Sequence, residues 1–112
     1  MTHPVEELFA TYEAALMADD LDTLRDLFWP DATRYGTDGN QRSGNEIDAA
    51  RRRPHEVRPR TLDRTMIRSV GDEVAIAETE FERDGRHGRQ SQVWVRRDGR
   101  WGILHAHVSM HP

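Results

Sequence analysis

The last two alternating runs of the chain carry side chains that could perform chemistry together. Gln90 and Gln92 lie in the first run, and His105 and His107 lie in the second. Amides can pair with the donors and acceptors of a urea-type ligand, and imidazoles bind metals or relay protons. Two histidines at i, i+2 spacing share a strand face, but catalytic zinc sites use three protein ligands and no third is evident nearby. The pattern therefore favours a hydrogen-bonding pocket wall with no metal.

An Asp98-Gly99 pair joins the two runs and predicts a tight hairpin, because both residue types tolerate the positive φ angles of a type I′ turn. A two-residue loop also fixes the register of the strands that flank it. The register places Gln92 opposite His105 and Gln90 opposite His107, so these four side chains share one face. We expect His107 to contact a ligand or relay a proton there, with a satisfied core histidine as the alternative.

The opposite face of the predicted hairpin is apolar. Its small and branched members are Val93, Val95, Ala106 and Val108. Left open, such a face would be a large exposed apolar patch, so we expect a homodimer formed through it. The same register puts Arg89 on this face, although a bulge at Gly88 would move Arg89 into the pocket as a binding residue.

Tyr12 lies in the middle of an apolar stripe that recurs at helical spacing from Pro4 to Met17 and predicts a first helix. A buried tyrosine usually finds a partner for its hydroxyl. A core tyrosine bonded to a backbone carbonyl would meet that need, and so would a phenol that points into a pocket. From the residues alone the core interpretation is the more usual one, and both stay open.

Arg34 alternates with Thr33 and Tyr35 on a short predicted strand. If these two neighbours face outward, the guanidinium faces inward, where an unpaired charge is very costly. Arg34 must then meet an internal acid such as Glu13, or a bound anion, which a guanidinium captures with two hydrogen bonds. The sequence leaves the two interpretations evenly balanced.

The elements that must position these residues change from a helical period to a period of two along the chain. Helices are expected at residues 4–17, 21–28 and 45–53, a turn at 37–41, and strands at 33–35, 60–69, 74–83, 88–97 and 100–110. Asp20 and Ser43 are the expected N-caps of the second and third helices. Trp29, at the end of the second helix beside Pro30, could close the pocket. Helices followed by strands predict an α+β fold, with the helices on one face of an antiparallel sheet.

Composition limits the possible classes of protein. The 112 residues are expected to form one domain, 1–112, and the absence of cysteine excludes thiolate chemistry. A net charge of −4 argues against nucleic acid as a partner. No apolar run has the length of a membrane span and the N-terminus lacks signal-peptide features, so a cytoplasmic protein without a membrane partner is expected. All 16 basic residues are arginine, and the cluster at residues 51–60 is interpreted as a solvated helix end and loop.

Several segments together resemble a known family. They are Tyr12-Glu-Ala-Ala-Leu16, Leu27-Phe-Trp29, Thr33-Arg-Tyr-Gly36, Gly44-x-x-Ile47, Gly88-Arg-Gln-Ser-Gln-x-Trp94 and Ala106-His-Val-Ser109. The chain is similar to the nuclear transport factor 2-like superfamily, in which a strongly bent antiparallel sheet wraps N-terminal helices into a cone with a pocket at its open end. Over nearly the whole chain it resembles the AtzH-like family, whose genes accompany amidases of cyanuric acid and oxalurate catabolism. The last hairpin is also similar to the association (hub) domain of calmodulin-dependent kinases.

The AtzH-like resemblance implies an amidohydrolase of nitrogen catabolism that acts on small carboxylated ureas such as 1,3-dicarboxyurea, without metal or cofactor. It implies catalytic roles for Tyr12 and Arg34. Substrate would be bound by a wider set of pocket residues, namely Trp29, Gln90, Gln92, His107 and, in reserve, Arg89.

Two alternatives belong to other functional classes. A non-catalytic ligand-binding and oligomerisation module, like the kinase hub domain, would turn over no urea carboxylate. An isomerase or lyase of the same fold would need a carboxylate in the pocket as its base, and Asp31 is the candidate for that role.

Overall fold

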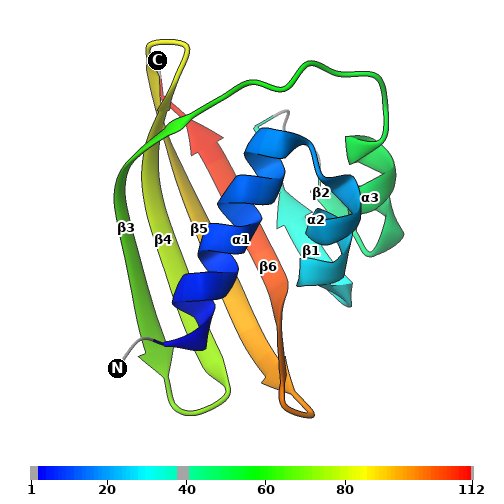
Figure 1. Ribbon diagram of the computed structural model, residues 1–112, viewed down its shortest axis with the longest axis vertical. Coiled ribbons are helices and arrows are strands. Elements are labelled where there is room, and N and C mark those ends of the chain that lie inside the picture. The colour runs from blue at the N-terminus through cyan, green and yellow to red at the C-terminus, as the bar shows by residue number, and fades with distance from the viewer. Residues whose placement is uncertain (1–2, 38–40, 112) are drawn as a thin grey trace.

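The computed structural model describes residues 3–37 and 41–111. Across these ranges, three helices lie on one face of a six-stranded sheet that curves around the first helix (Figure 1). The helices are α1 (Pro4–Ala18), α2 (Leu21–Leu27) and α3 (Asn45–Arg51). The strands are β1 (Phe28–Tyr35), β2 (Gln41–Ser43), β3 (Thr61–Val70), β4 (Val74–Arg83), β5 (Arg86–Arg97) and β6 (Arg100–Met110). This is the α+β architecture that the sequence predicted.

The strand order is β2-β1-β6-β5-β4-β3, and one pair departs from the expected antiparallel pattern. β1 and β6 run parallel, whereas the other neighbouring pairs are antiparallel. Parallel neighbours need a long crossover connection, and here that connection is most of the chain, from β2 to β5. The sheet is therefore mixed, and it brings Arg34 of β1 opposite Ala106 of β6.

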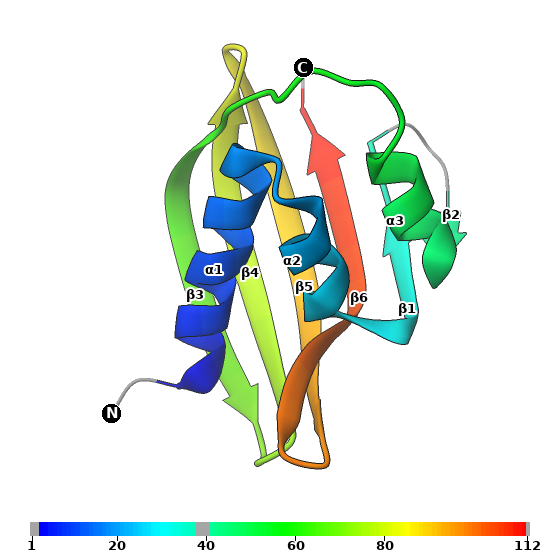
Figure 2. The same ribbon diagram turned by 45° about the vertical axis from the view of Figure 1, so that its right-hand side comes forward.

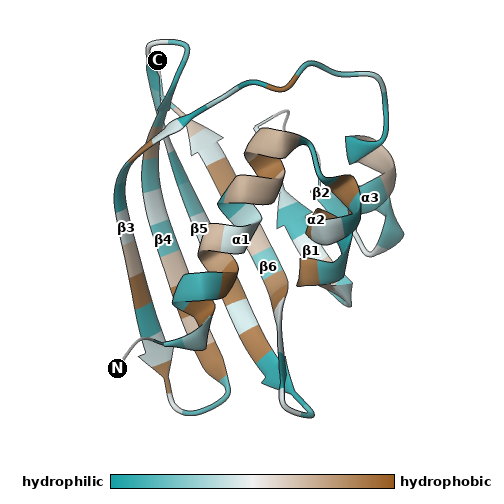
Figure 3. Ribbon diagram, viewed as in Figure 1, coloured by the Kyte–Doolittle hydropathy of each residue, from teal (hydrophilic) through white to brown (hydrophobic). Residues whose placement is uncertain are grey.

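α1 buries one face against the inner side of the sheet (Figure 2). Its buried residues follow helical spacing: Val5, Phe9, Tyr12 and Ala15. Along the strands, hydrophobic and hydrophilic residues alternate, as Figure 3 shows by colour. The inward residues of β4 and β5 include Ala75, Ala77 and Trp94, which join the same core cluster. This alternation is what a sheet with one covered face requires.

The β5–β6 hairpin has the predicted turn but not the predicted register. Asp98 and Gly99 have φ angles of 50° and 78°, as a type I′ turn requires. Trp94 pairs with Ile103 as expected, but the next pair is Val93 with His105, so Leu104 is an extra residue in β6. A bulge of one residue moves every later side chain of that strand to the other face.

The bulge changes which residues share a face with the two glutamines. Gln92 pairs with Ala106 and Gln90 pairs with Val108, and all four face α1. Ala106 is 2% exposed and belongs to the core, and Val108 lines the main cavity. The prediction that Ala106 and Val108 belong to the dimer face is therefore wrong, because both face the inside of the protein.

The outer face of the sheet holds the residues that the sequence placed inside. His105 and His107 pair with Val93 and Ser91 of β5 and point away from α1. Both histidine rings contact Tyr35 edge-on, with centroids 5.1 and 5.6 Å away. Val93 remains on this outer face.

The boundaries of α2 and α3 also differ from expectation. α2 ends at Leu27, and Phe28 begins a strand that continues past Pro30, where the pairing with β6 is irregular. A proline is tolerated in a strand at such an irregularity because no ladder hydrogen bond is lost. Asp20 caps α2 as predicted, since its carboxylate accepts a hydrogen bond from the Thr23 backbone N–H.

Gly44, rather than Ser43, is the N-cap of α3. Gly44 has a φ of +52°, and a Cβ there would lie 2.8 Å from the Pro30 carbonyl oxygen, so glycine is required. Ser43 instead hydrogen-bonds the carboxylate of Glu46. α3 ends at Arg51, two residues before the expected end. The turn expected at 37–41 falls largely on residues 38–40, outside the described ranges.

Candidate functional site

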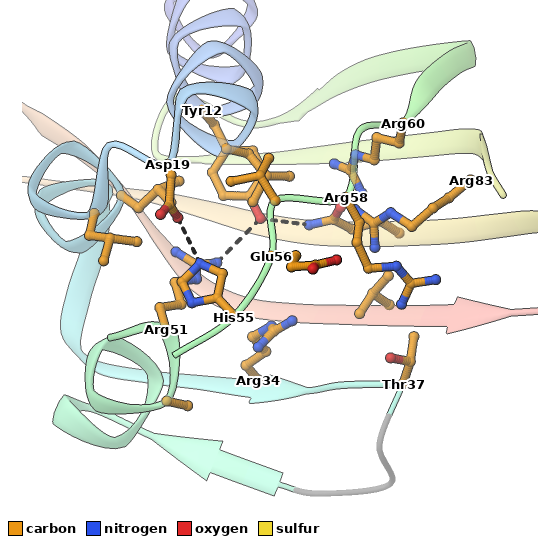
Figure 4. Close-up of a pocket in the computed structure, with 17 residues that line it drawn as sticks. Tyr12, Asp19, Arg34, Thr37, Arg51, His55, Glu56, Arg58, Arg60 and Arg83 are labelled. Atoms are coloured by element: carbon orange, nitrogen blue, oxygen red, sulfur yellow. Dashed lines mark hydrogen bonds and ion pairs between the residues drawn. The ribbon is translucent and has the colours of Figure 1, made fainter. Parts of the chain in front are cut away.

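A cavity of about 240 Å³ lies beside the C-terminal half of α1, at the open end of the curved sheet (Figure 4). Its walls come from α1, α2, β1, α3, β4, β5 and β6. Residues 52–60, which we call the strap, connect α3 to β3 and pass over this end of α1 (Figure 1). The charged side chains that line the cavity are five arginines and two acids: Arg34, Arg51, Arg58, Arg60, Arg83, Asp19 and Glu56. The cavity is therefore strongly cationic.

Tyr12 lies at the base of the cavity and is 3% exposed. Its hydroxyl oxygen accepts hydrogen bonds from Arg51 Nη2 at 3.4 Å and from Gln90 Nε2 at 3.3 Å. Both contacting atoms belong to N–H donors, so neither atom can accept the hydroxyl proton of Tyr12. That proton is available to a ligand in the cavity.

The pKa of Tyr12 reflects two opposing influences. Burial raises it, because the charged phenolate loses its hydration. The guanidinium groups of Arg51 and Arg60, the hydrogen bond from Gln90 and the charge of Arg34 lower it. The lowering influences are larger together, so the pKa of Tyr12 is below its usual value of 10.0. A phenol of lowered pKa is a better proton donor.

Arg51 is held between two aromatic rings. Its Cζ lies 5.1 Å from the ring centroid of Phe28 and 5.9 Å from that of Tyr12. Within residues 3–37 and 41–111, no carboxylate forms an ion pair with Arg51. Cation–π contacts position this guanidinium without neutralising it, which leaves its charge for an anion.

Arg60 is fixed differently, by an acid. Its guanidinium binds the Glu13 carboxylate with two hydrogen bonds, one of them from Nε at 3.2 Å, and its side chain is 2% exposed. Its Cζ also lies 4.5 Å from the ring centroid of Phe81. Glu13, the acid that the sequence offered as a structural partner for Arg34, is thus the partner of Arg60.

Arg34 lines the cavity together with Tyr12, as the sequence predicted. Its neighbours Thr33 and Tyr35 face outward, where Thr33 Oγ1 hydrogen-bonds His105 at 2.8 Å. Arg83 reaches the other side of the cavity (Figure 4), and its Nε is buried with no hydrogen-bond partner among the described residues. Burial lowers the pKa of Arg83, and the positive charges of Arg60 and Arg58 lower it further. An anion near Arg83 would relieve this unfavourable environment.

Several ion pairs hold the strap, and two of them lie on either side of Glu56. His55 Nε2 lies 2.8 Å from Asp19 Oδ1, and its Nδ1 lies 2.6 Å from the Arg53 carbonyl oxygen. Both partners are acceptors, so the imidazolium form, which donates from both nitrogens, fits this position. The pKa of His55 is accordingly raised, first by the Arg53 carbonyl and then by Asp19. Further along, Arg58 Nε donates to Asp84 at 3.1 Å.

Four of the five predicted binding residues do not line the cavity, namely Trp29, Gln92, His107 and Arg89. Gln92 is fully buried and accepts a hydrogen bond from Trp94 Nε1 at 3.0 Å. Trp29 donates to the Val95 carbonyl at 2.9 Å and lines a different cavity. His107 is on the outer face of the sheet, because the bulge at Leu104 reversed the alternation of β6.

Gln90 does line the cavity, but Arg89 does not. The ladders around Gly88 are regular, with no bulge there, so Arg89 stays on the outer face, 3.9 Å from Glu80. Asp31, the base named for an isomerase or lyase, forms an ion pair with Arg97 at 2.8 Å and is not a cavity residue.

Sequence reasoning missed the cavity arginines of the 51–60 cluster, which it interpreted as solvated. Arg51 lies one turn after the buried Ile47 on α3, a spacing that puts both side chains on the same inward face. That spacing was the available signal for Arg51. No comparable local signal exists for Arg60, because the path of the strap decides its position.

The described part of the chain contains no helix long and apolar enough to cross a membrane. Within the same ranges, no three His, Cys, Asp or Glu side chains are grouped to hold a metal ion.

The chain has the nuclear transport factor 2-like fold, with a cationic cavity at the open end of its sheet. The family model described as AtzH-like matches residues 1–112, and the chain belongs to the AtzH-like family. No curated protein matches the chain.

Solved structures share the fold. A protein of unknown function from Pectobacterium atrosepticum, of the DUF3225 family, is 39% identical over 96% of this chain and 88% of its own, with a TM-score of 0.88. An NTF2-like protein from Cytophaga hutchinsonii matches at 17% identity over 99% of this chain and all (100%) of its own, with a TM-score of 0.81. The association domain of Caenorhabditis elegans CaMKII matches at 21% identity over 94% of this chain and 92% of its own, with a TM-score of 0.77. The last two likenesses concern the fold alone.

Proposed function

We propose that this protein is a cytoplasmic, cofactor-independent amidohydrolase that cleaves a C–N bond of small carboxylated ureas, of which 1,3-dicarboxyurea is the type. One observation carries the proposal. The buried phenol of Tyr12 accepts hydrogen bonds from Arg51 and Gln90, and its own proton is free to meet a ligand in a cationic cavity. The reaction class is the one that the AtzH-like resemblance implies, and the family match over residues 1–112 supports that choice.

In this proposal the arginines of the cavity bind the anionic substrate, and the phenol of Tyr12 donates a proton. Arg34 and Arg51 would bind a substrate carboxylate and orient the urea group. Their charge would also stabilise the negative charge that develops on the carbonyl oxygen, an effect of about 10²–10³-fold for one such donor. Tyr12 would protonate the leaving nitrogen, and a positioned general acid contributes about 10²–10⁴-fold.

The test follows freshly prepared ¹³C-labelled 1,3-dicarboxyurea and allophanate by NMR, with ammonia and hydrogen carbonate as products. We expect turnover by the wild type and a loss of about 10²-fold or more in Tyr12→Phe. Tyr35→Phe is the matched control, since Tyr35 lies on the outer face and should leave the rate unchanged. Glutarate, a stable dianion without a cleavable C–N bond, reports binding separately by calorimetry.

A binding and assembly module is the second candidate, favoured by the likeness to the CaMKII association domain. It would bind glutarate and leave every urea carboxylate intact. For either function we propose a homodimer formed through the outer face of the sheet. Of the four residues predicted for the dimer interface, Val93 and Val95 lie on this outer face. Sedimentation of Val93→Glu should then show a monomer where the wild type is a dimer.

A further inference from the structure

We propose that Glu56, on the strap, is the general base that takes a proton from the attacking water. The inference rests on the proposed amidohydrolase function and supplies the water-activating group that Tyr12 and Arg34 do not provide. A phenol that donates a proton to the leaving nitrogen cannot, in the same step, accept one from water.

Two acids line the cavity, and one of them is already engaged. Asp19 is bound to His55 at 2.8 Å. Glu56 is exposed and has no hydrogen bond or ion pair with any residue of 3–37 or 41–111, although five arginines line the same cavity. Figure 4 shows Glu56 reaching from the strap into the space framed by Tyr12, Arg34 and Arg58. Its carboxylate is therefore available to a ligand or water in the cavity, and it forms no contact that would stabilise the fold.

The strap holds Glu56 in place from both sides. His55, the residue before it, is bound to Asp19 at the end of α1. Arg58, two residues after it, is bound to Asp84 in the turn between β4 and β5. Anchors on either side restrict where the intervening carboxylate can lie, which a catalytic base needs. Asp19 and Asp84 thereby act as positioning residues for Glu56.

The proposed step balances as a hydrolysis. The water oxygen bonds to the urea carbonyl carbon while Glu56 takes one water proton. The C–N bond then breaks, and the nitrogen receives the hydroxyl proton of Tyr12. Transfer of the proton from Glu56 to the Tyr12 phenolate, through solvent in the open cavity, restores both groups. The sum is the addition of one water across the C–N bond, which yields a carbamic acid and a new N–H.

The test compares full-length Glu56→Gln with wild type on 1,3-dicarboxyurea. Glu73→Gln, an exposed glutamate in the turn between β3 and β4, is the charge-matched control. We expect kcat of Glu56→Gln to fall by about 10²–10⁴-fold, with glutarate bound at least as tightly as by wild type. Formate should restore part of the activity of Glu56→Ala, because it can replace the missing carboxylate.

The pH profile gives a readout that a structural role would not change. The titratable and charged side chains around the cavity are Tyr12, Asp19, Arg34, Arg51, His55, Arg58, Arg60 and Arg83. An acid limb of the kcat profile that is present in wild type and in Glu73→Gln, and absent in Glu56→Gln, is the mark of a lost general base. Glu73→Gln keeps every cavity side chain, so its profile shows what His55 and the other cavity groups contribute.

The outcomes separate this inference from the proposed function. A wild type that binds glutarate but cleaves no carboxylated urea overturns the proposed function, and the role of Glu56 falls with it. An active wild type with an equally active Glu56→Gln overturns the inference alone. Loss of glutarate binding in Glu56→Gln, without rescue of Glu56→Ala by formate, also overturns it, because Glu56 would then be structural.

Discussion

The hydroxyl oxygen of Tyr12 and Nη2 of Arg51 lie 3.4 Å apart, although 39 residues separate them in the chain. Tyr12 comes from the middle of α1 and Arg51 from the last turn of α3. The contact is made where the two helices meet the open end of the sheet, so it depends on the correct docking of α3. It also joins the proposed acid to the proposed anion site.

Replacing Arg51 by Met should raise the pKa of Tyr12, because Arg51 is the largest of the influences that lower it. The chain has two tyrosines, so the experiment uses a Tyr35→Phe background in which only Tyr12 contributes a phenolate absorbance. Arg53→Met, an exposed arginine that does not line the cavity, is the control and should leave the ultraviolet titration unchanged. An unaltered titration in Arg51→Met would show that this guanidinium does not act on the phenol.

Tyr12 should make the free energy of unfolding increase with pH in the window between its folded pKa and 10.0. Since the pKa of Tyr12 is lowered in the folded state, the folded protein loses this proton at a lower pH than the unfolded chain. Between the folded pKa and the unfolded value of 10.0, the unfolded chain binds more protons, and stability therefore increases with pH. The contribution is complete above 10.0 and lost as pH falls through the folded pKa.

Urea unfolding of wild type and Tyr12→Phe over this pH range measures the effect. Tyr12→Phe also loses hydrogen bonds, which lowers its free energy of unfolding by the same amount at every pH. The informative quantity is therefore the difference between the two proteins in the slope of unfolding free energy against pH. Parallel curves for the two proteins would contradict a lowered pKa.

Local periodicity indicated that Tyr12 is buried and that Arg34 faces inward if its neighbours face outward, but it left open what either side chain contacts. Tyr12 follows from the 3.6-residue period of α1, and Arg34 from the alternation of β1 between two outward neighbours. The Asp98-Gly99 turn was also predictable, because only its φ angles and neighbouring residues matter. These features depend on a few consecutive residues.

Features that depend on one extra residue or on a distant chain path could not be predicted. Leu104 is unremarkable in sequence, yet its insertion into β6 moved His107 to the outer face. The Arg60 side chain is 2% exposed because the strap carries it onto Glu13, 47 residues away in the chain, and onto Phe81 of β4. No local pattern distinguishes it from Arg53, which is exposed.

Glu13→Ala should destabilise the fold by about 3 kcal/mol, because it leaves the buried guanidinium of Arg60 without its acid. The Arg60 side chain is 2% exposed and that of Glu13 is 14% exposed, so solvent cannot replace the lost partner. Urea unfolding checks the value, and Glu7→Ala, on the exposed side of α1, is the control. A change no larger than that of Glu7→Ala would mean that the pair contributes little to stability.

Asp19→Asn should loosen the strap and lower the pKa of His55. Asp19 ends α1 with a φ of 54°, a conformation that asparagine also tolerates, so the helix end should be retained. The pKa of His55 is raised in the folded state, so its contribution to strap attachment is full below the unfolded value of 6.5 and is lost as pH rises through the folded pKa. NMR titration of the His55 ring should show a lower pKa in Asp19→Asn, and amide hydrogen exchange should be faster across residues 55–58. If the His55 titration is identical in both proteins, the Asp19 contact does not hold the strap in solution.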